Sequence, residues 1–502
     1  MKIIFLSFVL IMTCFSKLKA GNGDSIFNMQ YIHTLHITFP YPNFYDSLLN
    51  SHTTDQYLQV DIDFNGQILN NVGIKAKGNS SFNSPSQKKS FKLDLNEFIS
   101  GQDLHGLKKI NFNNSFKDPS FMREKLANDF LIDHGIPAPR VTYCNVYMNN
   151  QLWGLYAVIE EIDDEFCKKW FSNNDGNLFK GDPHGDLRWK GSATQSLYES
   201  EYELKNNSTT NNWSDLISLI SIINNTPVSN LQAALEPKLN TVSFVKQWAA
   251  LNMFSSLDSY IGSGHNYYIY HDTILDKFQW IAWDNNEAFG SFKNSLSSAQ
   301  LLNLDLYYLS NPTSKPLCNN MLNNPYFKEL YKAAYCELKQ DFNNINFDPK
   351  IDSLKNKIQS SVYADPKKIY TSSQFDSSFN FNLSLSGPGG LTIFGLKSFI
   401  TDRSNNIQSN LASNGVICWP NSISSIDKEN KTIQLSPNPV IDILDIVSET
   451  PINNIQVFDM LGKIILNREG LQSYSEQLDF KEFPTGIYIV QVNKIHKYRI
   501  LK

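Results

Sequence analysis

Alternating apolar and polar positions dominate the chain from about residue 28 to residue 115. Residues 57–64 (YLQVDIDF) alternate, and Asn65 and Gly66 follow them. A second run ends at Lys77, and a third covers residues 90–95. A two-residue period places successive side chains on opposite faces of a sheet, and Asn-Gly favours a tight hairpin turn. We therefore predict that this region consists mainly of strands.

Helical spacing follows the strand region. Asp118 and Pro119 are predicted to open a helix, because aspartate accepts hydrogen bonds from free amides and proline suits the first turn. Gly135 is predicted to end it. The apolar stripe of this helix comprises Met122, Leu126, Phe130 and Leu131.

The chain between residues 141 and 390 is predicted to mix both element types. Residues 205–230, rich in Asn, Ser and Thr, are interpreted as a linker or an insertion, and residues 371–390 as a long loop. A helix is predicted over residues 243–257, with Trp248 and Leu251 on its buried side. The other expectations are strands over residues 141–161, with a turn at Asn149 and Asn150, and helices over residues 318–360.

Two aromatic runs, residues 265–272 and 277–284, are separated by about four turn-like residues. They are predicted to pair as an antiparallel hairpin. If Tyr270 or His271 lies opposite Phe278, the register determines what meets at the open end of the hairpin.

In that register Asn266 lies beside Trp283 or Asp284, since opposed residues in such a ladder have Cα atoms about 5 Å apart. Asp258 comes just before the hairpin. Phosphoryl transfer needs Mg²⁺ on hard oxygen ligands and a carboxylate that accepts the proton of the attacking hydroxyl. Protein kinases use the chain order base Asp, metal Asn, hairpin, metal Asp, which Asp258, Asn266 and Asp284 repeat with a wider first step. The alternative is a surface hairpin with polar ends.

The N-terminal half offers cations for phosphate. Lys92 lies in a strand whose apolar side chains point the other way. Residues 77–81 form a Gly/Ser loop that can approach phosphates with backbone amides. The next helix carries residues 123–125, Arg-Glu-Lys, and in kinases a helix glutamate holds the strand lysine.

The pattern changes again from Thr432. Short alternating strands separated by turns are typical of a small all-β sandwich. The predicted strands are residues 440–447, 455–458, 463–466 and 486–492.

Charge and the first residues add two constraints. A net charge of −5 over 502 residues gives no concentrated basic surface for nucleic acid. Residues 1–20 combine Lys2, an apolar run over residues 3–15 and a small residue at the end, which indicates a secretory signal. That run is too short to span a bilayer, and no later stretch is apolar enough, so no transmembrane segment is expected after signal removal.

Five cysteines follow the predicted signal, an odd number, and none lies in a metal-binding spacing. Cys318 and Cys336 are interpreted either as a disulfide or as buried free thiols. The 23 tyrosines and 8 tryptophans leave open a carbohydrate-binding or polysaccharide-modifying role, although aromatic richness usually reflects the core.

Several segments, in order, resemble the successive motifs of the CotH kinase family over roughly residues 55–340. The resemblance implies an α+β, atypical protein-kinase-like fold that binds ATP and Mg²⁺ and phosphorylates Ser or Thr of secreted or coat proteins. These segments are residues 73–80, 88–92, 118–127, 135–140, 153–156, 160–161, 265–268 and 283–290.

The resemblance also implies residue roles. Asp258 is the expected catalytic base, and Asn266 and Asp284 are the expected metal ligands. The sequence departs from the family at Lys77, where arginine is usual, and at Asn286, where a second carboxylate is frequent. The residues expected to bind ATP are Lys92, Lys77, Asn79, Ser80 and, near the adenine, Glu160.

Residues 435–439, 457–463, 484–488 and the basic end 497–502 resemble the C-terminal sorting domain of type IX secretion cargo in Bacteroidetes. The expected organisation is a signal (1–20), a CotH-like kinase domain (21–425) and an all-β sorting domain (426–502). The expected partners are the type IX secretion machinery and a secreted or surface protein substrate.

The prediction is thus a secreted or surface-located ATP-dependent phosphotransferase of the protein Ser/Thr kinase type. The alternative is a catalytically degenerate surface structural or adhesion protein that keeps the CotH fold.

Overall fold

The computed structural model describes residues 22–385, 391–418, 433–437, 440–459, 463–484, 486–494 and 496–502. The expected signal, residues 1–20, lies outside the described residues, as does the boundary expected between residues 425 and 426. The chain divides into two compact units, residues 1–417 and 418–502. Among the described residues, no helix combines the length and apolar character needed to cross a membrane.

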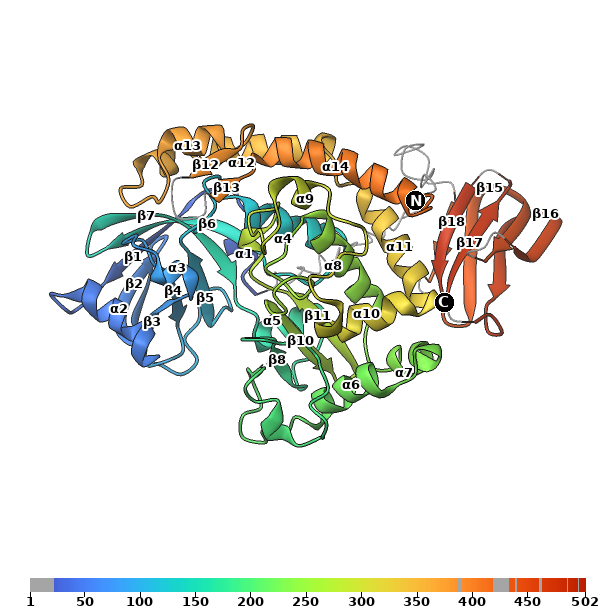
Figure 1. Ribbon diagram of the computed structural model, residues 1–502, viewed down its shortest axis with the longest axis horizontal. Helices are drawn as coiled ribbons and strands as arrows, with labels where there is room; N and C mark the ends of the chain where they lie inside the picture. The colour runs from blue at the N-terminus through green and yellow to red at the C-terminus, as the bar shows by residue number, and fades with distance from the viewer. Residues whose placement is uncertain are drawn as a thin grey trace, which may run out of the picture. The chain divides into compact units, whose positions relative to one another are not determined.

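Seven strands of the first unit form a closed barrel (Figure 1). Neighbouring strands are antiparallel except at the closure, where β1 and β6 pair in parallel. The inward side chains of the alternating runs, such as Val60, Ile74 and Leu93, are buried in the barrel core. In barrel order the strands are β1 (His33–Thr38), β2 (Leu58–Phe64), β3 (Gln67–Lys77), β4 (Ser90–Asp94), β5 (Lys109–Asn113), β7 (Gln151–Glu160) and β6 (Val141–Met148).

The prediction of strands in this region is confirmed, with one omission. Helix α2 (Phe44–Thr54) packs against β3 and buries Leu48, which the strand interpretation did not foresee. The turn between β6 and β7 lies at Asn149 and Asn150 as predicted. Both residues have positive φ, 47° and 64°, which suits the turns that connect tight hairpins.

Helix α4 (Arg123–Asp133) begins later than predicted. Asp118 and Pro119 form a turn before it, so the expectation that they open the helix is wrong. The Asp118 carboxylate nevertheless accepts a hydrogen bond from the backbone N–H of Arg123 at 2.8 Å. The predicted stripe is buried, and Gly135, with φ of 71°, follows the helix end.

The predicted aromatic hairpin is present as β10 (Tyr267–Asp272) and β11 (Lys277–Ala282). His271 pairs with Phe278 and Tyr267 with Ala282, so the register is one of the two foreseen. The hairpin belongs to a four-stranded sheet of order β11-β10-β8-β9, with β8 (Leu178–Lys180) and β9 (Glu203–Leu204). Helix α8 (Thr241–Met253) packs against β11 and buries Trp248 and Leu251 as predicted.

Two predicted loops contain regular structure. Residues 205–230 include α6 (Ser214–Asn225), because the leucines and isoleucines of residues 216–223 recur at helical spacing and are buried. The other loop includes α13 (Ser372–Ser377), which begins at a capping box of Thr371 with Gln374, and β12 (Leu383–Leu385). Residues 386–390 lie outside the described residues.

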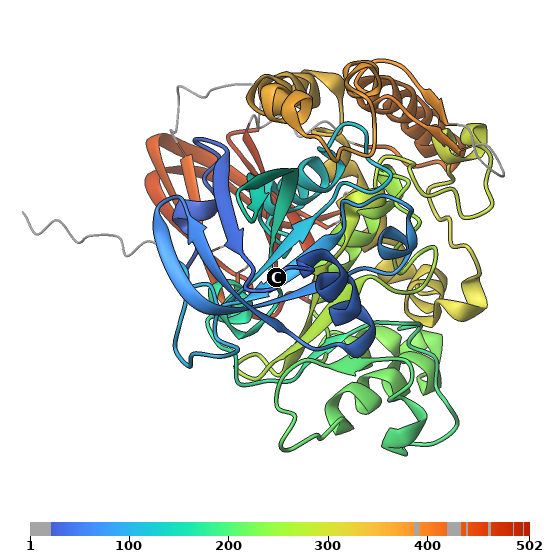
Figure 2. The same ribbon diagram turned by 90° about the vertical axis from the view of Figure 1, so that its left-hand side faces the viewer.

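Helices dominate residues 316–364, as expected. Figures 1 and 2 place α12 and α14 side by side along one edge of this unit and α6 and α7 along the opposite edge. Cys318 is a buried free thiol, which rules out its pairing with Cys336. The remaining elements are α1 (Asp24–Phe27), α3 (Ser80–Asn83), α5 (Asp164–Phe171), η1 (Gln195–Leu197), η2 (Val228–Asn230), α7 (Leu231–Leu235), η3 (Asn285–Glu287), α9 (Ser298–Leu302), η4 (Pro312–Ser314), α10 (Pro316–Asn323), α11 (Pro325–Lys339), α12 (Asn344–Ala364), β13 (Leu391–Ile393) and α14 (Leu396–Ser413).

The described residues of the second unit form strands, as predicted, but in one sheet rather than in the two of the expected sandwich. The predicted strands 440–447 and 455–458 belong to one long strand, and the strand predicted at 463–466 extends to Asp479. A single five-stranded sheet contains them, and bulges interrupt the pairing of the long β15 with β16. Both halves of β15 contribute side chains to one core, including Ile446 and Val457. The strands are β14 (Ile433–Ser436), β15 (Ile443–Phe458), β16 (Ile464–Asp479), β17 (Ile487–Val492) and β18 (His496–Leu501).

Candidate functional site

The open end of the hairpin presents two polar residues in unusual backbone conformations. Asn266 precedes β10 with φ of 62°, and Asp284 follows β11 with φ of 55° and ψ of 50°. The left-handed region is uncommon for residues other than glycine, and Asn and Asp tolerate it best. Because Tyr267 pairs with Ala282, these two residues lie where the ladder ends. Backbone outliers of this kind often accompany functional sites.

Asp258 is tied to the same end by its backbone and its side chain. Asn266 Nδ2 donates to the Asp258 carbonyl oxygen at 2.9 Å. Ser263 Oγ and His265 Nε2 each lie 3.1 Å from Asp258 Oδ1. The Asn266 amide therefore directs its nitrogen at the backbone and keeps its oxygen for another partner.

The charges at this end are close enough to influence one another. Burial and the Asp258 charge raise the pKa of Asp284, while Lys77, Lys180 and His265 oppose the shift. Burial lowers the pKa of His265, but its hydrogen bond with Asp258 and the Asp258 charge outweigh burial, so the net shift is upward. Two acidic groups that repel each other are stabilised by a cation between them.

Helix α4 fixes the segment that follows Asp284, and it packs against η3. Asn285 Nδ2 donates to Asn128 Oδ1 at 2.8 Å. Arg123 Nη1 donates to the carbonyl oxygens of Ala288 and Phe289, each at 3.0 Å. The Asp284 turn is therefore anchored to the helix rather than free at the surface.

A hydrogen-bonded row on the outer face of the barrel, opposite the side chains that form the barrel core, connects both candidate lysines. Lys92 Nζ lies 2.5 Å from Glu161 Oε1, and Asn111 Nδ2 donates to Glu161 Oε2 at 2.5 Å. Lys77 Nζ donates to Asn111 Oδ1 at 3.0 Å and lies 5.6 Å from the ring centre of Trp283. Since Trp283 precedes Asp284, the row reaches the hairpin end.

Electrostatics favour this arrangement of charges. Burial opposes ionisation of Glu161, but the Lys92 charge and hydrogen bonds from Lys92 and Asn111 outweigh burial and lower its pKa to about 2. Burial and the Lys92 charge lower the pKa of Lys77, against the opposing charges of Asp284, Glu161 and Glu124. The helix glutamate Glu124 thus lies near Lys77, whereas the ion-pair partner of Lys92 is Glu161.

Sequence reasoning missed Asn111 and Glu161. The motif at residues 160–161 contains two glutamates, and the prediction names Glu160 rather than Glu161. For Asn111 the only local signal was its place in a strand between apolar neighbours.

Among the described residues, no hydrogen bond or ion pair connects three of the expected ATP-binding residues to this row. Glu160 is bound by Arg140, with Nη2 2.5 Å from Oε1, and by Lys169 at 3.5 Å. Successive strand residues face opposite sides, so Glu160 and its neighbour Glu161 diverge. Asn79 and Ser80 are exposed at the start of α3.

The donors at the hairpin end fit a magnesium ion. Among the described residues, no group of three or more His, Cys, Asp or Glu side chains is arranged to hold a metal. Asp284, the oxygen of the Asn266 amide and nearby Asp258 are hard oxygen donors. Mg²⁺ commonly binds one or two carboxylates and completes its shell with water and phosphate oxygens, so a small donor set suits an ion that arrives with a nucleotide.

Comparison with known proteins identifies the class of this chain. Residues 74–384 match the family model described as CotH kinase protein. This match spans more than half of the chain, and the chain therefore belongs to the CotH kinase family.

Two further matches refine this result. Inner spore coat protein H of Bacillus subtilis (strain 168) is 24% identical over 295 residues, which cover 58% of this chain and 78% of that protein. Residues 434–502 match the secretion system C-terminal sorting domain. A sorting domain of this kind implies export through a secretion system and a location at the cell surface.

Proposed function

We propose that this protein is an exported phosphotransferase that moves the γ-phosphate of Mg-ATP to Ser or Thr hydroxyls of a secreted or surface protein. The observation that supports this most directly is the meeting of Asp258, Asn266 and Asp284 at one hairpin end. The lysine row on the outer face of the barrel adds the positive charge that a polyphosphate requires.

Asp258 is suited to act as the base. Its Oδ1 is held by Ser263 and His265, which fixes the carboxylate and leaves Oδ2 for the acceptor hydroxyl. A carboxylate within hydrogen-bond reach of that hydroxyl orients it and takes its proton as the phosphate is transferred.

Asp284 and the Asn266 amide oxygen would hold Mg²⁺. Neutralisation of charge on the β- and γ-phosphates is what the ion supplies when bound. The contacts of Asn285 with Asn128 and of Arg123 with the following backbone keep the Asp284 turn in place, so little reorganisation is needed on binding.

Lys92 and Lys77 would have different roles. Lys92 is committed to Glu161, so it serves to position the row. Lys77 has three N–H donors, and Asn111 takes one of them, which leaves donors for phosphate oxygens. Burial and the Lys92 charge lower the pKa of Lys77, while the nearby acids Asp284, Glu161 and Glu124 favour its charged form.

Transfer of label from γ-labelled ATP tests the proposal, with Mg²⁺ present and dephosphorylated casein as a probe acceptor. We expect Asp258→Asn and Asp284→Asn each to reduce transfer by about 100-fold or more. Asp352→Asn is the matched control, because Asp352 is an exposed acid on α12 that pairs with Lys397.

Transfer that survives both site substitutions would refute the assignment of these residues. ATP-dependent thermal stabilisation without transfer to casein or to the protein itself would favour the non-catalytic structural alternative.

A further inference from the structure

Strand β8 runs beside the hairpin and ends where the hairpin opens. It pairs antiparallel with β10, with Lys180 opposite Tyr268. Antiparallel neighbours run in opposite directions, so the last residue of β8 lies beside the first residues of β10. Asn266 and Asp284 lie at this same end. Lys180, which has no role in the proposed function so far, is therefore a neighbour of the residues expected to hold Mg²⁺.

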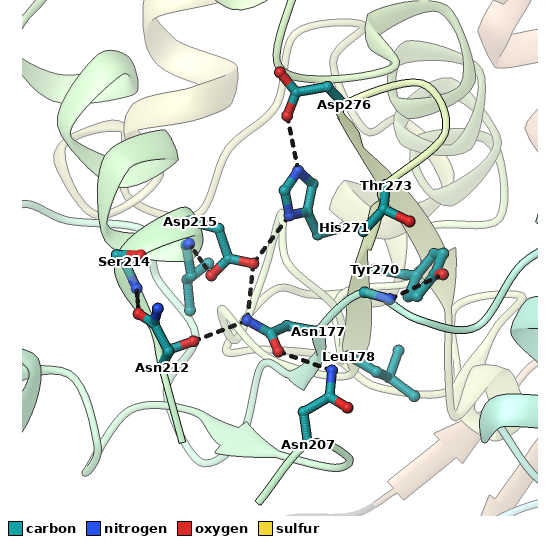
Figure 3. Close-up of polar contacts among 12 residues, drawn as sticks. Asn177, Leu178, Asn207, Asn212, Ser214, Asp215, Tyr270, His271, Thr273 and Asp276 are labelled. Carbon is teal, nitrogen blue, oxygen red and sulfur yellow. Dashed lines mark hydrogen bonds and ion pairs between the residues drawn. The ribbon is translucent and has the colours of Figure 1, made fainter. Parts of the chain in front are cut away.

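The position of β8 is fixed at the start of the strand (Figure 3). Asn177 Nδ2 donates to the carbonyl oxygen of Asn212 at 2.8 Å and to Asp215 Oδ2 at 2.9 Å. The Asn177 carbonyl oxygen accepts a hydrogen bond from the backbone N–H of His271 at 2.9 Å. Because β8 has only three residues, these contacts also determine that Lys180 is the residue at its other end.

Lys180 and Tyr268 share one face of the sheet with Trp283. Paired residues of a ladder lie on the same face, and so do side chains two residues apart on a strand. Tyr268 also pairs with Ile281, two residues before Trp283. The ring centres of Tyr268 and Trp283 are 5.5 Å apart, and Lys77 Nζ lies 5.6 Å from the Trp283 ring centre. The two rings therefore connect Lys77 of the barrel with Lys180 of the sheet.

The Tyr268 hydroxyl is available to a ligand. Tyr268 is only 3% exposed, yet its hydroxyl forms no hydrogen bond with any residue that the structure describes. The hydroxyl oxygen is not fully shielded from solvent, so a group that enters the site can reach it. Buried hydroxyls are normally hydrogen-bonded, and a hydroxyl can donate to an anion. A ligand at this end of the hairpin can therefore supply the missing partner.

Lys180 is charged and keeps donors for a ligand. Its Nζ lies 2.6 Å from Asp182 Oδ2, and the Asp182 side chain is 38% exposed. Burial disfavours the ammonium. The charges of Asp182, Glu203 and Asp284 outweigh burial and raise the pKa of the lysine. An ammonium has three N–H donors, and among the described residues only Asp182 accepts one of them.

The pair of Lys180 and Asp182 lies on the side of the proposed base. Burial lowers the pKa of His265, and Asp258 and then Asp182 raise it. His265 Nε2 is 3.1 Å from Asp258 Oδ1, so Asp182 lies near that contact. Lys77 belongs instead to the row on the barrel. The two lysines therefore approach the hairpin end from different parts of the fold.

We propose that Lys180 is a further phosphate-binding residue that donates to the γ-phosphate of the nucleotide, and that the Tyr268 hydroxyl donates to the same group. The γ-phosphate has to lie between the ion at Asp284 and the base Asp258, and the Lys180–Asp182 pair lies on that side. Positive charge placed there stabilises the group in transfer. This inference rests on the proposed function and adds to it a cation from the sheet.

Nucleotide binding to the full chain in the presence of Mg²⁺ tests this assignment. The β,γ-imido analogue of ATP, ADP and adenosine are titrated by calorimetry. Lys180→Met is expected to weaken binding of the analogue by about 10-fold or more through a lost charge-assisted hydrogen bond. Tyr268→Phe is expected to weaken it by about 3- to 10-fold. ADP, which lacks the γ-phosphate, should lose little affinity in either variant, and adenosine none.

Two further variants separate a lost contact from a disturbed fold. Lys205→Met is the matched control, because Lys205 pairs at 2.6 Å with an acid two residues away, Glu203, as Lys180 does with Asp182. It should bind the analogue as the wild type does. Lys180→Arg keeps the charge and should restore most of the affinity that Lys180→Met loses.

The outcomes distinguish this inference from the proposed function. Unchanged binding of the analogue in Lys180→Met, or an equal loss for the analogue and for ADP, overturns the inference. If the wild-type chain binds the analogue but transfers no phosphate from ATP, the proposed function fails, while the variants still decide whether Lys180 binds the γ-phosphate. A wild-type chain that binds none of the nucleotides overturns both.

Discussion

The two ends of the β10–β11 hairpin carry similar residue types but differ in how their charges are satisfied. At the turn end, the Asp272 carboxylate is saturated by donors, and His271 sits between two acids. At the open end, burial and repulsion by the Asp258 charge raise the pKa of Asp284.

This difference separates acids that stabilise the fold from acids whose mutual repulsion opposes it. A carboxylate with several short donors stabilises the folded chain. A carboxylate pair without enough counter-charge costs stability until a cation arrives. One hairpin therefore combines an end where the acids are saturated by donors with an end where two acids repel each other.

The largest expected effect comes from removing charge at the open end. Asp284→Asn is expected to abolish most phosphate transfer while raising the melting temperature at pH 8, because it removes a buried charge and its repulsion with Asp258. Because the pKa of Asp284 is raised in the folded state, its ionisation destabilises the fold at high pH. The gain in melting temperature should therefore disappear as the pH falls and Asp284 becomes protonated. Calorimetry at pH 8 and pH 4 measures this, and a loss of stability at pH 8 would contradict the like-charge picture.

At the turn end, we expect the opposite result, a loss of stability without a loss of phosphate transfer. Asp272→Ala leaves the donors of Asn173, Ile274 and Leu275 without their acceptor and should lower the free energy of unfolding by about 2 kcal/mol. The rate of phosphate transfer to a small acceptor should stay near wild type. Denaturant unfolding measures the first quantity, and a neutral effect would show that the turn does not depend on this carboxylate.

The contacts of His271 with Asp215 and Asp276, which we call the His271 clamp, predict a pH-dependent contribution to the stability of the fold. The hydrogen bond with Asp215 is the main cause that raises the pKa of His271, and the bond with Asp276 adds to it, against burial. A raised folded-state pKa makes this stabilisation complete below the unfolded pKa of about 6.5 and lost as the pH rises through the folded value. His271→Gln should therefore lower the melting temperature more at pH 5.5 than at pH 8.5, and equal losses at both would count against the charged clamp.

The smallest expected effect is a gain in affinity for Mg²⁺. Asn286→Asp places a further carboxylate two residues after Asp284 and should raise the affinity for Mg²⁺ several-fold in the presence of ATP. Without Mg²⁺ the same variant should melt slightly earlier, because it adds to the negative charge already there. Titration of Mg²⁺ followed by thermal shift distinguishes this from a substitution that simply perturbs η3.

Much of the local structure could be predicted from the sequence. The alternation in residues 57–64 and the two aromatic runs predict strands. The sequence left two registers for the hairpin, with Asn266 beside Trp283 or Asp284, and the structure has the one in which Tyr267 pairs with Ala282. The stripe from Met122 to Leu131 determines the buried face of α4. Each of these features depends on residues that are near neighbours along the chain.

Other features depended on contacts that no local pattern encodes. The parallel pairing of β1 with β6 closes the barrel across more than a hundred residues. The pairing of β5 with β4 and with β7 brings Asn111 and Glu161 between Lys77 and Lys92. Glu160 and Glu161 were equivalent in sequence, and only the strand's orientation separated them. The segment that contains helix α6 was predicted as a linker because polar residues flank its short apolar stripe.

The sequence alone therefore determined which side chains share a face or a hairpin end, since period and turn chemistry are local properties. The tertiary structure decided which faces meet and how each charge is satisfied, because burial and electrostatic pairing depend on segments that come together only on folding.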